Sequence, residues 1–130
     1  MFKKSTNKVL LIEPDIVLAN IYTKALNKKG IEVHSVSMAQ SAISLIDKIK
    51  PGLIILELCL PANNGIEFLY ELRSYPDLKY IKVIVLSYTS KTELRISPNQ
   101  AKILNIYRYL YKPSTSVSKL VEVVVSGLQK

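Results

Sequence analysis

The chain has few of the cysteine and histidine residues on which small secreted proteins and zinc proteins depend. Its 130 residues include one cysteine, one histidine and no tryptophan. The single cysteine, Cys59, excludes an internal disulfide and a cysteine metal cluster, and it is compatible with a reducing compartment. A domain of this length buries roughly two-thirds of its unfolded surface, so the fold does not require a disulfide.

Long apolar runs are also missing. Residues 1–7 carry charge and lack the apolar segment of a signal peptide, and no uninterrupted apolar stretch approaches the roughly 18 residues of a membrane-spanning helix. These absences predict a cytoplasmic protein without a membrane span. We expect residues 1–7 to form an N-terminal tail and residues 8–130 to form one domain.

Acidic residues are the minority among the charged ones. The chain has 18 Lys and Arg against 10 Asp and Glu, for a net charge of +8. A positive surface favours acidic partners, which include proteins, membrane headgroups and nucleic acids. The basic residues are scattered, with the densest group at Lys24, Lys28 and Lys29, and no nucleic-acid-binding motif accompanies them. A basic adaptor that associates with nucleic acid is therefore a secondary hypothesis.

Strand-like and helix-like patterns alternate along the whole chain. Strands are predicted at residues 8–13, 31–36, 53–57, 81–86 and 107–111, and helices at residues 15–29, 37–50, 65–74, 98–105 and 115–128. This alternation predicts an α/β fold in which helices cover both faces of a five-stranded parallel sheet, doubly wound in the flavodoxin-like manner.

Capping and breaking residues set several of these helix bounds. Asp15 is expected to cap the first helix, and residues 37–40 fit a capping box that opens the second. Proline is tolerated in the first turn of a helix but breaks its interior. We therefore expect the fourth helix to begin at Pro98, capped by Ser97, after a loop or irregular turn at residues 89–96.

The third predicted strand ends in a carboxylate. Residues 53–57 read Leu-Ile-Ile-Leu-Glu, follow a Pro-Gly pair and precede a loop at residues 60–65. Such a run between turn signals is typical of a buried parallel strand. Open α/β sheets place their sites at the carboxyl ends of their strands, so Glu57 marks the candidate site.

Several motifs, in this order, resemble the receiver domain of two-component response regulators over residues 8–129. They are the acidic end of the first strand at Glu13, the Leu-Pro and Asn-Gly pairs of residues 60–65, Ser87 after the fourth strand, and the run Tyr-Leu-Tyr-Lys-Pro at residues 109–113. In that family the position of Glu57 holds an aspartate that accepts a phosphoryl group from a histidine kinase. The resemblance implies the flavodoxin-like fold and a signalling module rather than an enzyme.

The resemblance also implies a Mg²⁺ site. Its oxygens would come from the end of the first strand, from the phosphoacceptor and from a backbone carbonyl two residues further on, which correspond here to Glu13 with Pro14, to Glu57 and to Cys59. Proline has no side-chain oxygen and Mg²⁺ demands near-octahedral oxygen ligation, so weak Mg²⁺ binding is predicted. Asp15 is an alternative ligand, although its expected role is the helix N-cap.

The same resemblance assigns the remaining site residues. Lys112 corresponds to the lysine that contacts the phosphate, and it is predicted to form a partly solvated ion pair with Glu57. Ser87 and Tyr109 correspond to the switch residues that respond to the phosphate. The Lys112–Pro113 bond is a candidate cis peptide.

Glu57 is one methylene longer than aspartate, which argues against conventional phosphorylation. Displacing the nucleophilic oxygen by about an ångström costs on the order of 100-fold in rate. We therefore expect a receiver-like module that acts through protein–protein contacts without Asp phosphorylation. The alternative is a working phospho-receiver that uses Glu57 with Glu13 or Asp15 and Mg²⁺.

The expected partner is a histidine kinase, an output protein or another receiver, bound on the face formed by residues 98–128. Tyr107, Tyr109 and Tyr111 are aromatic anchor candidates there, and strand alternation is expected to turn all three to one side. A homodimer through this face is an open alternative.

Overall fold

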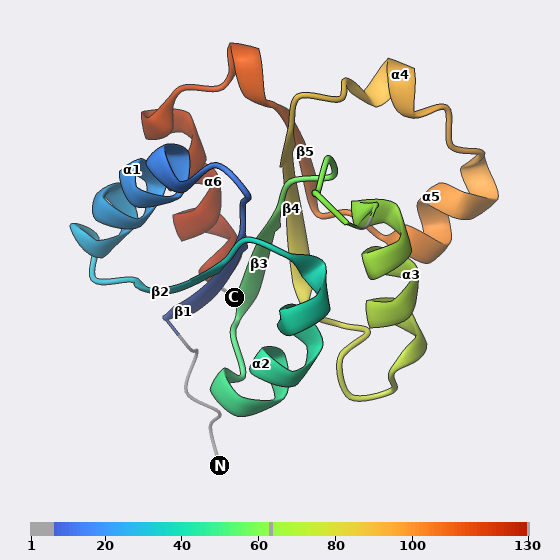
Figure 1. The fold of residues 1–130 in the computed structure, drawn as a ribbon, viewed down its shortest axis with the longest axis horizontal. Coiled ribbons are helices and arrows are strands. Elements are labelled where there is room, and N and C mark those ends of the chain that lie inside the picture. Colours follow the sequence, from blue (N-terminus) through green and yellow to red (C-terminus); the bar gives the residue numbers. More distant parts are fainter. Residues whose placement is uncertain (1–6, 63, 130) are drawn as a thin grey trace.

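The computed structural model describes residues 7–62 and 64–129, and its centre is a five-stranded parallel sheet (Figure 1). The strands are β1 (Lys8–Ile12), β2 (Glu32–Val36), β3 (Leu53–Leu56), β4 (Lys82–Ser87) and β5 (Arg108–Tyr111). Their spatial order is β2-β1-β3-β4-β5. The order reverses beside β1 and β3, the topological switch point of a flavodoxin-like sheet, so the predicted winding is confirmed.

Helices cover both faces of this sheet. They are α1 (Ile16–Asn27), α2 (Ala42–Ile49), α3 (Gly65–Ser74), α4 (Lys91–Leu94), α5 (Pro98–Leu104) and α6 (Val117–Leu128), with 3₁₀ turns η1 (Ala39–Ser41) and η2 (Lys112–Ser114). Helices α1 and α6 pack side by side on one face, whereas α2, α3 and α5 lie on the other (Figure 1).

The core divides into two clusters, one on each face of the sheet. Alternate residues of β1 show the division, because Val9 and Leu11 belong to the cluster under α1 and α6 while Leu10 and Ile12 belong to the cluster under α2 and α3. All four side chains are fully buried. This is the pattern of a parallel strand covered on both sides, and it explains why the central strands β1, β3 and β4 are nearly continuous apolar runs.

Two predicted caps are present. The Asp15 carboxylate accepts the backbone N–H groups of Val17 at 2.9 Å and Leu18 at 3.1 Å. Ser97 forms a capping box with Gln100, and proline occupies the first turn of α5. The sequence located both helix starts because side-chain caps are local features.

The predicted capping box at residues 37–40 is wrong. The 3₁₀ turn η1 intervenes, Met38 is its N-cap, and α2 begins only at Ala42 without a side-chain cap. Ala39 and Ala42 are both buried in the core. Packing of these small side chains determines where the chain turns, and it overrides the local capping signal.

The segment between β4 and β5 is more ordered than predicted. It contains the four-residue helix α4, opened by a capping box between Ser90 and Glu93 and ended by Arg95 in the left-handed region at φ 52°. The expectation of a loop or irregular turn at residues 89–96 is corrected accordingly. The Lys112–Pro113 bond is trans and lies in η2, so the suggested cis peptide is wrong.

Arg73 on α3 forms hydrogen bonds with the C-terminal end of the segment between β4 and β5. Its guanidinium donates to the carbonyls of Leu104 and Asn105 at the end of α5 and to those of Lys79 and Ile81 before β4, at 2.8 to 3.1 Å. One side chain therefore ties three segments together. Burial lowers the pKa of this guanidinium.

Residues 1–6 of the predicted N-terminal tail lie outside the described residues, and the carbonyl of Asn7 accepts the N–H of Glu32 at 2.9 Å. Among the helices of the described chain, none combines the length and the apolar character needed to span a membrane.

Candidate functional site

The backbone of the sheet places two carboxylates next to each other. The N–H of Glu57 donates to the carbonyl of Ile12 at 3.0 Å, and the N–H of Glu13 donates to that of Val36 at 3.0 Å. These bonds continue the strand pairing one residue beyond β1 and β3. The two acidic residues therefore emerge together at the carboxyl edge, as the strand-end argument predicted.

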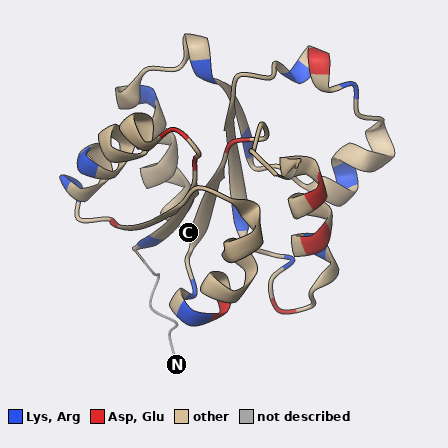
Figure 2. Cartoon of the chain, in the orientation of Figure 1, with Lys and Arg blue, Asp and Glu red and all other residues tan. Residues whose placement is uncertain are grey.

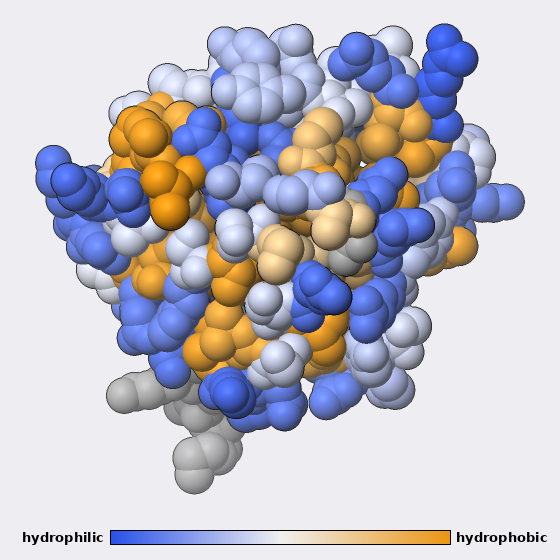
Figure 3. Space-filling view, in the orientation of Figure 1, coloured by the Kyte–Doolittle hydropathy of each residue, from blue (hydrophilic) through white to orange (hydrophobic). Residues whose placement is uncertain are grey.

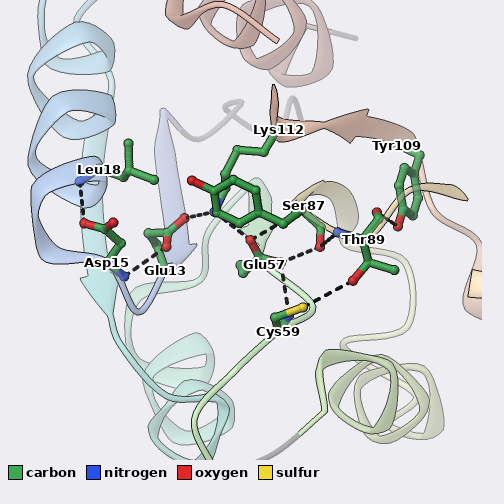
Figure 4. A network of polar contacts seen from close by, with 10 residues as sticks. Glu13, Asp15, Leu18, Glu57, Cys59, Ser87, Thr89, Tyr109 and Lys112 are labelled. Atoms are coloured by element: carbon green, nitrogen blue, oxygen red, sulfur yellow. Dashed lines mark hydrogen bonds and ion pairs between the residues drawn. The ribbon is translucent and has the colours of Figure 1, made fainter. Parts of the chain in front are cut away.

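Lys112 lies between these carboxylates (Figure 4). Its Nζ is 2.8 Å from Glu13 Oε1 and 2.6 Å from Glu57 Oε1. The side chains are only 5% exposed for Lys112 and 2% exposed for each glutamate. The predicted Lys112–Glu57 contact is present, but its expected partial solvation is wrong, because η2 seats the lysine over the site and Glu13 closes the other side.

The Glu57 carboxylate is fully engaged. Besides Lys112, it accepts the hydroxyl of Ser87, the backbone N–H of Cys59 at 3.0 Å and the backbone N–H of Tyr88 at 3.4 Å. These donors come from the last residue of β4 and the residue after it, from the loop after β3 and from η2. Within the described residues, no buried side-chain nitrogen or oxygen lacks a hydrogen-bond partner.

Hydrogen bonds compensate the burial of these charges. Burial would raise the pKa of Glu57, but the Cys59 amide, Lys112 and Ser87 outweigh it and hold the pKa below its usual value. Burial would likewise lower the pKa of Lys112, and the two glutamates raise it instead. The ammonium also lies 4.5 Å from the centre of the Tyr88 ring, a cation–π contact. These contacts therefore favour the ionised forms of Glu57 and Lys112.

The loop after β3 packs closely against the start of α3. Asn64 caps α3 through the N–H of Ile66 at 2.7 Å, and the N–H of Gly65 donates to the carbonyl of Leu58 at 2.9 Å. A Cβ on Gly65 would lie 2.7 Å from the Cα of Leu58. The Asn-Gly pair is therefore needed for the close approach of α3 to this loop.

The side-chain oxygens at this edge that could bind Mg²⁺ are engaged in other contacts. Lys112 Nζ bonds both carboxylates that a metal would need, Pro14 offers no side-chain oxygen, and the Asp15 carboxylate caps α1 while its N–H donates to Glu13 at 3.0 Å. Cys59 presents its backbone N–H to Glu57. Within residues 7–62 and 64–129, no group of three or more His, Cys, Asp or Glu side chains could hold a metal ion.

Both switch positions are engaged with the site. Ser87 donates to Glu57, and its oxygen accepts the N–H of Thr89 at 3.1 Å. The hydroxyl of Tyr109 donates to the carbonyl of Thr89, and its ring packs against the core cluster under α2 and α3. Burial, and next the charge of Glu57, raise the pKa of Tyr109 to about 12. Tyr109 therefore lies inward, joined to Glu57 through two residues.

The sequence missed the parts that Tyr88 and Thr89 play here. Tyr88 covers the lysine and supplies an amide, whereas Thr89 joins Ser87 to Tyr109 and contacts the exposed thiol of Cys59 at 3.2 Å. Their position directly after Ser87 was the available signal.

The expectation that Tyr107, Tyr109 and Tyr111 share one side is wrong. Tyr107 packs with the cluster under α1 and α6, and Lys82 Nζ lies 5.1 Å from its ring centre, whereas Tyr109 packs on the opposite cluster. The reason is that β5 begins at Arg108, so strand alternation does not apply to residue 107. Tyr111 is exposed.

Comparisons with known proteins agree with this geometry. The model of the response regulator receiver domain family matches residues 9–125. The phosphorylated cyanobacterial phytochrome response regulator RcpA is 31% identical, with a TM-score of 0.74 over 93% of this chain and 90% of that one. The BeF₃-activated receiver domain of Klebsiella pneumoniae RstA has the same fold, with a TM-score of 0.80 at 20% identity over 95% of this chain and 99% of that one.

Curated relatives extend beyond the region that this chain matches. The KDP operon transcriptional regulatory protein KdpE of Escherichia coli is 33% identical over 105 residues, which are 81% of this chain and 44% of that protein. The probable transcriptional regulator ycf29 of Pyropia yezoensis is 32% identical over 106 residues, 82% of this chain and 46% of that protein. The chain thus spans less than half the length of either relative. The predicted resemblance is confirmed: the chain belongs to the family of response regulator receiver domains.

Proposed function

We propose that this receiver signals through protein–protein contacts without conventional phosphorylation, because Glu57 takes the place of a phosphorylated aspartate. The observation that carries the proposal is the set of contacts around the Glu57 carboxylate. It binds Ser87 and Lys112, which correspond to the residues that contact the phosphoryl group in the family, together with two backbone N–H groups.

The inward position of Tyr109 supports the same proposal. In receivers this aromatic residue moves between an exposed and an inward state, and here it lies inward while only a carboxylate occupies the site. A carboxylate carries about half to two-thirds of the charge of a phosphoryl group and lacks its third acceptor oxygen. In our proposal, burial strengthens the interaction enough for one carboxylate to hold the switch.

The surface through which the module acts is the face formed by residues 98–128. A groove of about 340 Å³ lies between α5 and β5, and it is lined by Lys91, Ile96, Ala101, Ile106, Tyr107, Arg108 and Tyr109. Because Tyr109 is both a wall of this groove and a contact of the site, its inward position shapes the surface offered to a partner. The partner is a histidine kinase, an output protein or another receiver, and the compartment is the cytoplasm.

Nucleic acid is not the partner in this proposal. Lysines and arginines are spread over most elements, while acidic residues gather on α3 and around the site (Figure 2). In the view of Figure 2, the basic residues that the structure describes do not form the continuous stripe that binding to phosphates requires.

Intact-mass analysis tests the proposed absence of conventional phosphorylation. The protein is incubated with Mg²⁺ and acetyl phosphate beside an aspartate-bearing receiver as the positive control. We expect labelling of the control and no added phosphoryl group on this chain. Stoichiometric, Mg²⁺-dependent labelling that disappears in Glu57→Gln would overturn the proposal and establish the phospho-receiver alternative.

A further inference from the structure

A second groove lies between α1 and α6, on the face of the sheet opposite α3. Its volume is about 620 Å³, and it is lined by Ala25, Lys28, Lys29, Val117, Ser118, Val121, Glu122 and Val125. Apart from Ser118, the side chains of α1 and α6 that line it are apolar or are long charged chains that can lie along apolar surface.

The floor of this groove has helical spacing. Val117, Val121 and Val125 follow one another every four residues along α6, so they form one stripe, and Ala25 faces them from α1. Eight residues of α helix rise about 12 Å. The floor is therefore long enough to seat about two turns of another helix.

The rim of the groove is basic. Lys28 and Lys29 line it at the end of α1, and Lys24 is exposed one turn earlier. Helix α1 contains no acidic residue, and Glu122 is the single carboxylate in the lining. None of the ion pairs found within the described residues involves these lysines. In the view of Figure 3, apolar surface over α1 borders hydrophilic surface at the C-terminal end of that helix.

We propose that this α1–α6 groove docks an amphipathic helix from a partner protein whose polar edge carries carboxylates. The apolar floor suits the apolar stripe of such a helix, and the lysines suit its acidic edge. A second copy of this chain fits less well, because each copy carries a net charge of +8 and would bring lysines of the same sign. A free anion would leave the apolar floor uncovered.

The proposal goes beyond the function assigned to Glu57 and stands independently of it. The lining of the α1–α6 groove shares no residue with the cluster of Glu13, Glu57, Ser87 and Lys112 or with the groove beside Tyr109. A partner in the α1–α6 groove would therefore leave the groove beside Tyr109 free for another.

Two synthetic peptides of about four helical turns test the proposal. Both carry leucines at every third or fourth position, and one has glutamates along the polar edge where the other has lysines. Titration into the isotope-labelled full chain is followed by NMR. We expect the acidic peptide to shift the amide signals of Ala25, Lys28, Val121 and Val125, and the basic peptide to leave them unchanged.

Charge reversal distinguishes specific binding in the groove from general attraction to a basic protein. The double variant Lys28→Glu with Lys29→Glu should bind the acidic peptide about tenfold more weakly, as expected for two rim charges, and should gain binding of the basic peptide. The control is Lys48→Glu with Lys102→Glu, which changes net charge equally at exposed positions outside the groove. Circular dichroism checks that both variants stay folded.

Three outcomes would overturn the proposal. The first is acidic-peptide binding that falls equally in both double variants, and the second is a shift pattern outside the groove. The third is movement of the groove signals with protein concentration alone, which would show that a second copy is the occupant.

Discussion

The two halves of the carboxyl edge differ in how far their residues match the family's site. The half beside β1, where the family resemblance places the metal ligands, has Pro14 in one position, an Asp15 carboxylate that caps α1, and Lys112 between the remaining glutamates. The half beside β4 and β5 keeps Ser87 and Tyr109 in contact with the site through Thr89.

Our proposal explains this difference by the unequal demands of the two tasks of a receiver. Phosphoryl transfer needs a nucleophile and metal oxygens placed to within about an ångström. Holding a switch needs only a negative group that reaches the right donors. In our proposal one buried glutamate meets the second demand but not the first, so Ser87 and Tyr109 can still respond although the phosphorylation chemistry is lost.

The largest expected effect is from Lys112→Met. The variant leaves Glu13 and Glu57 buried side by side without a cation, and breaking a buried pair in this way costs about 3–5 kcal/mol. Urea unfolding followed by circular dichroism measures the loss. The matched control, Lys102→Met on the exposed face of α5, should change the free energy of unfolding by less than about 0.5 kcal/mol. A similar small loss in Lys112→Met would mean that the cluster is not desolvated.

The second test attempts to restore phosphorylation by substituting residues 14 and 57. Glu57→Asp corrects the reach of the nucleophile but leaves Pro14, whereas Pro14→Asp adds a metal oxygen but leaves the carboxylate too long. We expect acetyl-phosphate labelling of the double variant to exceed that of either single variant by about 100-fold, because residues that act as a unit are strongly non-additive.

Labelling of Glu57→Asp alone would show that Glu13 and Asp15 hold the metal without residue 14. Absence of labelling even in the double variant would locate a further obstacle, for which Tyr88 over Lys112 and the α4 segment are the candidates.

A smaller effect is expected on the free energy of unfolding at acidic pH. The pKa of Glu57 is lowered from 4.5 in the folded state, so the unfolded chain binds more protons at low pH. Its stabilising contribution is present above pH 4.5 and is lost as the pH falls through the folded pKa. As the pH falls below 4.5, the free energy of unfolding of Glu57→Gln should therefore decline less steeply than that of the wild-type protein. Parallel curves for the two proteins would contradict the assignment.

The smallest expected effect is from Tyr109→Phe. The variant keeps the ring in its core cluster and removes only the hydroxyl that donates to Thr89, a loss of about 1 kcal/mol. Thermal unfolding measures it, and Tyr80→Phe, at a residue that is 79% exposed, is the control with no expected change. A larger loss would show that the hydroxyl, rather than ring packing, holds the switch inward.

Much of the fold was predictable because its signals are local or periodic. The apolar strand runs, the Asp15 and Ser97 caps and the placement of Pro98 each depend on a few neighbouring residues. The misses depended on tertiary packing, as with η1, where burial of Ala39 moved the helix start, and with Tyr107, which packs before β5 begins.

The site was predictable to a different extent. The positions of the strand ends and the family resemblance predicted that Glu13, Glu57, Ser87 and Lys112 lie together at one edge of the sheet. What the sequence did not reveal was that the lysine bridges both glutamates and is buried, because burial depends on η2 and on Tyr88, neither of which has a local signature.

NMR of the ¹³C-labelled Tyr109 ring, assigned with Tyr109→Phe, tests whether the Glu57 carboxylate holds Tyr109 inward without phosphate or metal. We expect wild-type protein free of phosphodonor and metal to show a ring with contacts to the α3-side core, and Glu57→Ala to show a solvent-averaged ring. A solvent-averaged ring in wild type, or an unchanged inward ring in Glu57→Ala, would contradict the proposal.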